Sequence, residues 1–239
     1  MTPDPQGGVH QTGLAEGFAL DPATLLPAEW YDRSSLVGDF LVMIDGQTEG
    51  DYLRRSPEKR FCEFIDGIVY MQAAASDKHQ SDVQFFIVIL ECFLEIRGGG
   101  LVFSGPATLR PRVNCILEPD LFVLPPAGRV HADDIDRDPP ALLVVEVLSP
   151  STRSHDLQRK SALYREAGTA ETWFVDDRDH VVIVERRTAR GYESSRVESG
   201  PIRSTGLPGF WFDADWLWAR PRPRLLACLD QILAGPPPG

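Results

Sequence analysis

A short apolar run with one acid inside it constrains the fold more than any other stretch of the chain. Residues 141–148, ALLVVEVL, are apolar at nearly every position, and Val144, Val145 and Val147 are β-branched. Such a run is typical of a strand that is covered on both faces. Glu146 lies within it, and an ionised carboxylate buried there is costly unless a cation, a metal or hydrogen bonds compensate it. The alternative is a glutamate at the strand's end that reaches water or a buried arginine.

The residues after this strand predict a helix that carries a lysine toward the sheet. Pro150 ends the strand, and Ser154 is a candidate N-cap with Asp156 in the first helical turn. Helical spacing puts Lys160 on the packing face, together with Leu157, Tyr164 and Ala167. An exposed i,i+4 pair between Asp156 and Lys160, worth only ~0.3 to 0.5 kcal/mol, is the alternative. Lysine is scarce in this chain, which favours a specific role for the Lys160 ammonium: of 24 Lys and Arg residues, only Lys59, Lys78 and Lys160 are lysine.

Length and composition predict one globular domain with short appendages. The chain has 239 residues and 43% hydrophobic content, and no apolar run approaches the ~20 residues of a membrane helix. We expect a poorly ordered acidic Gly/Pro-rich arm over residues 1–30, a domain over 31–219, and an Arg/Pro linker, short helix and tail over 220–239. No secretion signal is visible, and the cysteines contain no CxxC pair, so we expect reduced thiols in a cytoplasmic protein.

The net charge of −11 argues against a protein that coats nucleic acid through bulk charge. Clusters of arginine do occur, but a solvated face is their usual explanation. Four aspartates between residues 125 and 140 also read as a solvated loop, because the glycine and terminal glutamate of an EF-hand are absent: Asp133, Asp134, Asp136 and Asp138.

The N-terminal half predicts a helix, a hairpin and a long helix. Thr48 and Asp51 resemble a capping box that opens a short helix through about residue 55. The dipeptide at 66–67, Asp-Gly, predicts a type I′ hairpin between FCEFI and IVYM. Glu63 lies on this hairpin, and alternation alone does not decide which way it faces. Apolar spacing predicts a helix over residues 76–97, with His79 in its first turn, where a lone histidine is more often a cap or packing residue than a ligand.

Several strands follow, and one of them opens on a second candidate acid. We expect strands around 101–103, 108–113 and 121–124, and proline at 119 places Asp120 at the mouth of the last one. Further strands are expected over ETWFVD and HVVIVERR, joined by an Asp-rich turn, with edge strands over GYESSRV and around Ile202. The tryptophans at 211, 216 and 218 are expected in the core or at an interface.

Two acids and one lysine are therefore expected at one strand edge. Asp120 and Glu146, with a main-chain carbonyl such as that of Val147, suit a hard oxygen-binding cation, Mg²⁺ or Mn²⁺, which keeps several waters and bridges to phosphate. The Lys160 ammonium could orient or help deprotonate an attacking water and stabilise charge on the phosphate. The chain has no GxGxxG, GKS/T or GxSxG motif, so dinucleotide, P-loop and esterase interpretations lack their main support.

The segments RFCEFIDG, EPDLFVL, LLVVEVLSPST, DLQRKSALYREAG and ETWFVD resemble the Uma-two-type family of restriction-endonuclease-like proteins in the PD-(D/E)XK nuclease superfamily. The resemblance covers about residues 49–218. It implies an α+β fold with an αβββαβ core, in which helices flank a central mixed sheet, with an added N-terminal hairpin and C-terminal strands. It also implies a metal-dependent phosphodiesterase site that acts on nucleic acid, with DNA as the favoured substrate. A homodimer is a further implication of the resemblance. Asp120 and Glu146 match the two acidic elements, and the family's early acid and histidine fall on Glu63 and His79.

One departure from the superfamily pattern keeps two functions open. Leu148 stands where the catalytic lysine two positions after the acid would be, and Lys160 is the natural substitute. The first hypothesis is a Mg²⁺-dependent endonuclease. The second is a catalytically silent member that binds a partner or assembles as an oligomer, which the acidity and the absence of a DNA-reading module favour.

Overall fold

The structure, a computed structural model, describes residues 41–55, 62–72, 75–126 and 137–236 of the chain. Its central sheet has six strands in the order β11-β10-β9-β8-β7-β4. These strands are Gly191–Val197 (β11), Val181–Thr188 (β10), Glu171–Asp176 (β9), Leu143–Val147 (β8), Leu121–Leu124 (β7) and Leu101–Ser104 (β4). Strands β8 and β9 are parallel, and the other neighbouring pairs are antiparallel. The sheet is therefore mixed, as predicted.

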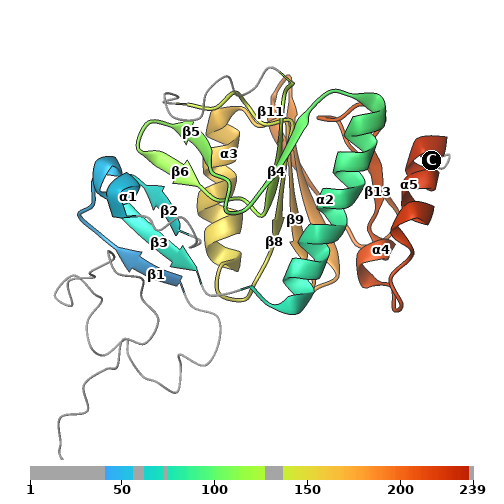
Figure 1. Cartoon of the computed structure of the whole chain (residues 1–239), viewed down its shortest axis with the longest axis horizontal. Helices are drawn as coiled ribbons and strands as arrows, with labels where there is room; N and C mark the ends of the chain where they lie inside the picture. The colour runs from blue at the N-terminus through green and yellow to red at the C-terminus, as the bar shows by residue number, and fades with distance from the viewer. Residues whose placement is uncertain (1–40, 56–61, 73–74, 127–136, 237–239) are drawn as a thin grey trace, which may run out of the picture.

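Helices cover both faces of this sheet (Figure 1). One face carries α2 (Asp77–Arg97), and the other carries a π-helical segment, η3 (His155–Lys160), that continues into α3 (Ser161–Ala167). In chain order α2, β4, β7, β8, α3 and β9 give the expected αβββαβ core.

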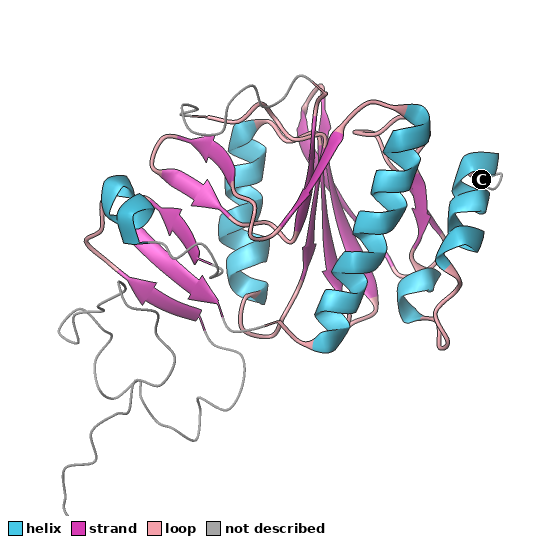
Figure 2. Ribbon diagram, viewed as in Figure 1, coloured by secondary structure: helices cyan, strands magenta, loops and turns pink. Residues whose placement is uncertain are grey.

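A second sheet of five strands lies beside the α3 face, in the order β1-β3-β2-β6-β5 (Figure 2). Its members are Leu41–Ile44 (β1), Ile68–Gln72 (β3), Cys62–Ile65 (β2), Cys115–Leu117 (β6) and Leu109–Arg112 (β5), with the helix α1 (Glu49–Arg55) alongside. The capping box is confirmed, since the Asp51 amide donates to Thr48 Oγ1 at 3.0 Å and the Thr48 amide to Asp51 Oδ2 at 3.1 Å. The hairpin is confirmed too: φ is 49° at Asp66 and 92° at Gly67, as a type I′ turn requires.

The C-terminal region packs on the outer side of α2. It comprises β12 (Pro201–Arg203), β13 (Trp211–Asp213), α4 (Asp215–Trp218) and α5 (Leu225–Ala234). The prediction of an edge strand around Ile202 was wrong in one respect, because β12 pairs with β13 in a separate two-stranded sheet. Ile202 is instead buried in the core that α2 shares with α5. Trp211 and Trp216 are buried there as expected, and Trp218 stacks on His180.

The alternation of side chains along β8 explains how one strand serves two cores. Leu143, Val145 and Val147 pack against the α2 side, whereas Val144 and the following Leu148 pack toward α3 and the second sheet. Because side chains alternate along a strand, Glu146 points to the same face as Val144 and Leu148. Its carboxylate is thereby sent toward α3.

Some predictions lie outside the described residues. The acidic arm over 1–30 and three of the four loop aspartates, Asp133, Asp134 and Asp136, belong to this group. The fourth, Asp138, is buried and accepts a hydrogen bond from the Arg110 amide at 2.7 Å. The four cysteines are free thiols. Within the described ranges, no helix has the length and apolar composition needed to cross a bilayer.

Candidate active site

The antiparallel register of β7 and β8 sets the two predicted acids opposite each other. Leu121 pairs with Val145, so Asp120 just before β7 faces Glu146 on β8. The Val147 amide donates to Asp120 Oδ2 at 2.7 Å, and the Asp120 amide lies 3.4 Å from Glu146 Oε2. Short-range backbone geometry therefore fixes both carboxylates at the end of the sheet.

Lys160 lies directly behind Glu146. Its ammonium is 2.6 Å from Glu146 Oε1, 3.0 Å from Glu63 Oε1 and 3.4 Å from Asp156 Oδ1, and its side chain is only 1% exposed. The lysine thus faces the sheet. The alternative of an exposed pair between Asp156 and Lys160 is wrong, because the two side chains do pair but both are buried. One ammonium is shared by three buried carboxylates.

The helix that carries Lys160 starts differently from the prediction. Ser154 has helical φ and ψ and makes no capping hydrogen bond through its side chain. The turn is stabilised one step earlier, where Ser149 Oγ accepts from the Thr152 amide at 3.3 Å. The Ser161 amide reaches back to the Asp156 carbonyl, five residues away, as in a π-helix. Such wide turns often occur at functional sites.

Glu63 enters this group from the second sheet. Its side chain is fully buried, and its Oε2 lies 3.0 Å from His155 Nε2. Burial alone would raise the pKa of Glu63, but the Lys160 ammonium and the His155 hydrogen bond outweigh it and lower that pKa to about 2. Glu63 is therefore an ionised acid that links the two sheets through Lys160.

The remaining buried acids repel one another. Burial raises the pKa of Glu146 well above its ordinary value despite Lys160, and the charges of Asp156, Asp120 and Glu63 add to the shift. Burial likewise raises the pKa of Asp156. Burial opposes the charge of Lys160, but Glu146 and Glu63 outweigh it and raise the pKa of the ammonium well above its usual range. The Tyr164 hydroxyl donates to Glu146 Oε1 and completes the contacts of that oxygen.

His79 holds the other acid. Its Nε2 lies 2.9 Å from Asp120 Oδ1, and α2 presents the ring because the Ser76 side chain accepts from the His79 amide at the helix start. Burial disfavours the charged ring, but the hydrogen bond and charge of Asp120 raise the pKa of His79 overall. The structure therefore brings together all five predicted side chains: Asp120 with His79, and Glu146 with Lys160 and Glu63.

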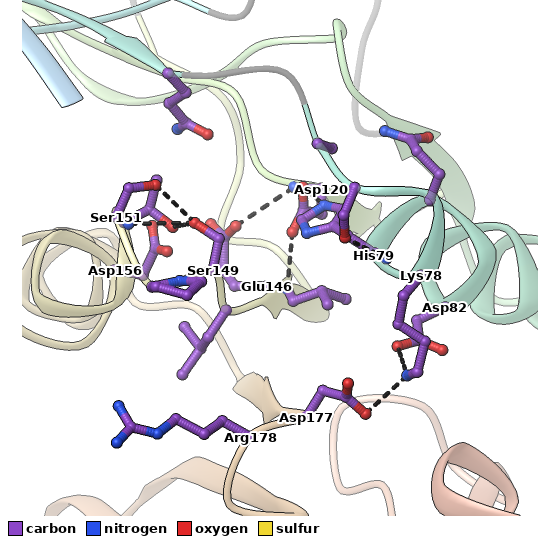
Figure 3. Close-up of a pocket in the computed structure, with 18 residues that line it drawn as sticks. Lys78, His79, Asp82, Asp120, Glu146, Ser149, Ser151, Asp156, Asp177 and Arg178 are labelled. Atoms are coloured by element: carbon purple, nitrogen blue, oxygen red, sulfur yellow. Dashed lines mark hydrogen bonds and ion pairs between the residues drawn. The ribbon is translucent and has the colours of Figure 1, made fainter. Parts of the chain in front are cut away.

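A cavity of about 290 Å³ opens beside these residues (Figure 3). Asp120, His79, Glu146, Val147 and Asp156 line it. Neither Lys160 nor Glu63 lines it, since both lie behind Glu146. This position favours a role for Lys160 through Glu146 over direct contact with a molecule in the cavity.

Sequence reasoning missed three supporting residues. His155 and Asp156 were adjacent to the predicted helix start but were not assigned to the site, and Tyr164 was assigned only to the packing stripe. One signal for Tyr164 was present, because a buried tyrosine four residues after Lys160 needs a partner for its hydroxyl. His155 carried no such signal, since its partner Glu63 is 92 residues away.

The donor atoms at Asp120 and Glu146 fit a hard divalent cation. Oε1 of Glu146 is engaged by Lys160 and Tyr164, while Oε2 lies on the Asp120 side. Within the described part of the chain, no three or more His, Cys, Asp or Glu side chains form a ready metal cluster. A cation here would be held by the two carboxylates, a main-chain oxygen such as that of Val147, and water, which is the pattern typical of Mg²⁺.

Comparison with known proteins agrees with this architecture. The model of the Uma2 family, described as "Putative restriction endonuclease", matches residues 50–215. The chain belongs to this family. Among solved structures, the crystal structure of a "putative nuclease belonging to DUF820" from Anabaena variabilis ATCC 29413 superposes with a TM-score of 0.57 at 15% sequence identity. The match covers 72% of this chain and 97% of that one, and at this identity it shows the shared fold. No protein of curated function matches.

Removal of the shared ammonium tests the electrostatics of this Uma2 site. Lys160→Met should lower the free energy of unfolding by about 3–5 kcal/mol, because it leaves buried carboxylates without a counter-charge. Glu146→Gln should lower it by less than half as much, since it removes one of the mutually repelling acids. Urea denaturation measures both. Lys78→Met is the matched control and should cost less, because Arg222 still pairs with its buried partner Asp82. A Lys160→Met loss no larger than the control's would contradict a shared buried counter-ion.

Acidification tests the ionised state of Glu63. Its pKa in the folded protein, about 2, lies below the ordinary 4.5, so its charge stabilises the fold above about pH 4.5. That contribution is lost as the pH falls from about 4.5 to about 2. The difference in unfolding free energy between the parent and Glu63→Gln should be largest at neutral pH and shrink across this window. A difference that stays constant from neutral pH to pH 2 would show that Glu63 carries no stabilising charge.

Proposed function

We propose that the chain is a Mg²⁺- or Mn²⁺-dependent endonuclease that hydrolyses phosphodiester bonds of nucleic acid, with DNA as the favoured substrate. The observation that carries the proposal is the β7–β8 register, which puts Asp120 opposite Glu146 at the wall of an open cavity. Membership in a family described as "Putative restriction endonuclease" supports the reaction class. The cost of holding like-charged carboxylates together supports a divalent cation, because such acids repel unless a cation joins them.

In this proposal the two acids are the metal ligands, with the Val147 carbonyl. A bound Mg²⁺ supplies charge neutralisation at the phosphate and lowers the pKa of the attacking water. Hydrolysis forms a bond from the water oxygen to phosphorus and breaks one ester P–O bond. The leaving oxygen takes up a proton, so the products are a phosphate monoester and a hydroxyl.

The surrounding side chains prepare these ligands. Lys160 and Tyr164 fix one oxygen of Glu146, and the Lys160 charge counters part of the burial that favours the neutral form of this acid. His79 and the Val147 amide hold the two oxygens of Asp120. Since the pKa of Lys160 is raised well above its usual range, the side chain stays an ammonium and has no lone pair to accept a proton from water, so its proposed role is positioning and charge compensation. Glu63 contacts the lysine in turn, and His155 contacts Glu63. The homodimer and the cytoplasmic location expected from the sequence stay predictions.

Cleavage and metal binding test the proposal together. With Mg²⁺ or Mn²⁺ the purified parent should nick plasmid DNA, and Asp120→Asn and Glu146→Gln should each lose about 10² to 10³ in rate, by analogy with the deletion of one electrostatic group elsewhere. Mn²⁺ should raise the melting temperature of the parent but not of these variants. Glu193→Gln, on the exposed edge strand β11, is the matched control and should behave as the parent.

Two results would overturn the proposal. Equal cleavage by parent and Glu146→Gln would mean a contaminating nuclease. No cleavage of plasmid, single-stranded DNA or RNA with either metal would favour the second hypothesis, a silent binding or oligomerisation module.

A further inference from the structure

Two basic side chains besides His79 line the cavity, and they differ in their contacts. Lys78 comes from α2 and Arg178 from the turn between β9 and β10. Figure 3 shows Asp177 and Arg178 on the side of the cavity away from Asp120 and His79. The Asp177 side chain extends toward Lys78, and that of Arg178 extends in the opposite direction.

The charge of Lys78 is already compensated. Its ammonium lies 2.5 Å from Asp82 Oδ2 and 2.8 Å from Asp177 Oδ1. Asp82 is fully buried and also pairs with Arg222. The Lys78–Asp177 ion pair therefore links the β9–β10 turn to the start of α2. Because both of its partners are acids, little of the Lys78 charge is left for a molecule in the cavity.

Arg178 lies on a turn whose backbone is held by neighbouring contacts. The Asp179 amide donates to Asp176 Oδ1 at 3.3 Å, and Arg153 pairs with Asp176 at 2.7 Å, so the backbone on either side is held. The Arg178 side chain is exposed, and among the described residues no hydrogen bond or ion pair to its guanidinium is found. Its five donors are therefore open to a ligand.

The acids that line the rest of the cavity favour such a cation for an anionic substrate. Five carboxylates line the cavity against the two cations: Asp82, Asp120, Glu146, Asp156 and Asp177. A nucleic-acid strand carries one negative charge per phosphate, so a phosphate near these acids is stabilised by a cation that pairs with it. Hydroxyls of Ser149 and Ser151, 2.9 Å from each other, also line the cavity and can donate to phosphate oxygens.

We propose that Arg178 binds a backbone phosphate next to the scissile one, and that the Lys78–Asp177 ion pair holds the turn that carries Arg178. The planar guanidinium fork matches two phosphate oxygens at once, which a lysine ammonium does not. This role rests on the proposed nuclease function. It places one of the substrate contacts on the β9–β10 turn, outside the metal ligands.

Steady-state cleavage of DNA by the full chain with Mg²⁺ tests this role. Arg178→Gln should raise KM about tenfold with kcat changed much less, because one charge-assisted contact to the bound strand is lost. The dependence of log KM on log salt should become shallower by about 0.7 to 0.9, the value of one phosphate contact. The KM of Arg178→Lys should lie between those of the parent and Arg178→Gln. The melting temperature should not change, since the side chain is exposed.

Arg196→Gln is the matched control, because Arg196 is exposed on β11, does not line the cavity and loses the same charge. If the parent cleaves and Arg178→Gln has the same KM and salt dependence as Arg196→Gln, the role of Arg178 is wrong while the nuclease function stands. If the parent neither cleaves nor binds nucleic acid, both proposals fail together.

Discussion

The ammonium of Lys160 is the counter-charge around which the buried polar centre is built. Glu146 reaches it from the central sheet, Glu63 from the second sheet and Asp156 from its own helix. Each of these carboxylates would be costly to bury alone, and the three repel one another, so none of them keeps its place without the cation. The docking of the second sheet onto the central one and the charge of Glu146 therefore depend on the same residue.

In the superfamily pattern, the acid and the lysine lie two positions apart on one strand, whereas in this chain they come from different elements. Here Leu148 fills the in-strand position and packs into the core, while the lysine reaches Glu146 from the opposite helix. In the proposed function, the cavity side of Glu146 is left to Asp120 and a divalent cation. In the same proposal, the phosphates are contacted by Arg178 and the hydroxyls of Ser149 and Ser151, all of which line the cavity. The acidity of the chain as a whole is compatible with this proposal, because the proposed substrate contact needs a local cation and not a basic surface.

The sequence predicted the parts of the fold that local chemistry decides. The apolar run around Glu146, the Asp66–Gly67 turn and the helical stripe with Lys160 all follow from neighbouring residues, and the register of two short strands then brings Asp120 to Glu146. Contacts that join distant segments were beyond its reach. Alternation left the direction of Glu63 open because its partner His155 lies in another layer. Strand β6 was missed because a three-residue strand has almost no periodicity. The expected Ser154 cap was replaced by a wide helical turn.

The central claim is that Asp120 and Glu146 share a divalent cation at the end of β7 and β8. Crystals of the protein soaked in Mn²⁺ would test it directly through the anomalous scattering of the metal. The account predicts one strong anomalous peak within about 2.0 to 2.3 Å of an oxygen of each carboxylate, with the Val147 carbonyl and water as further ligands. Mn²⁺ bound elsewhere on the chain with none between these two acids would contradict it.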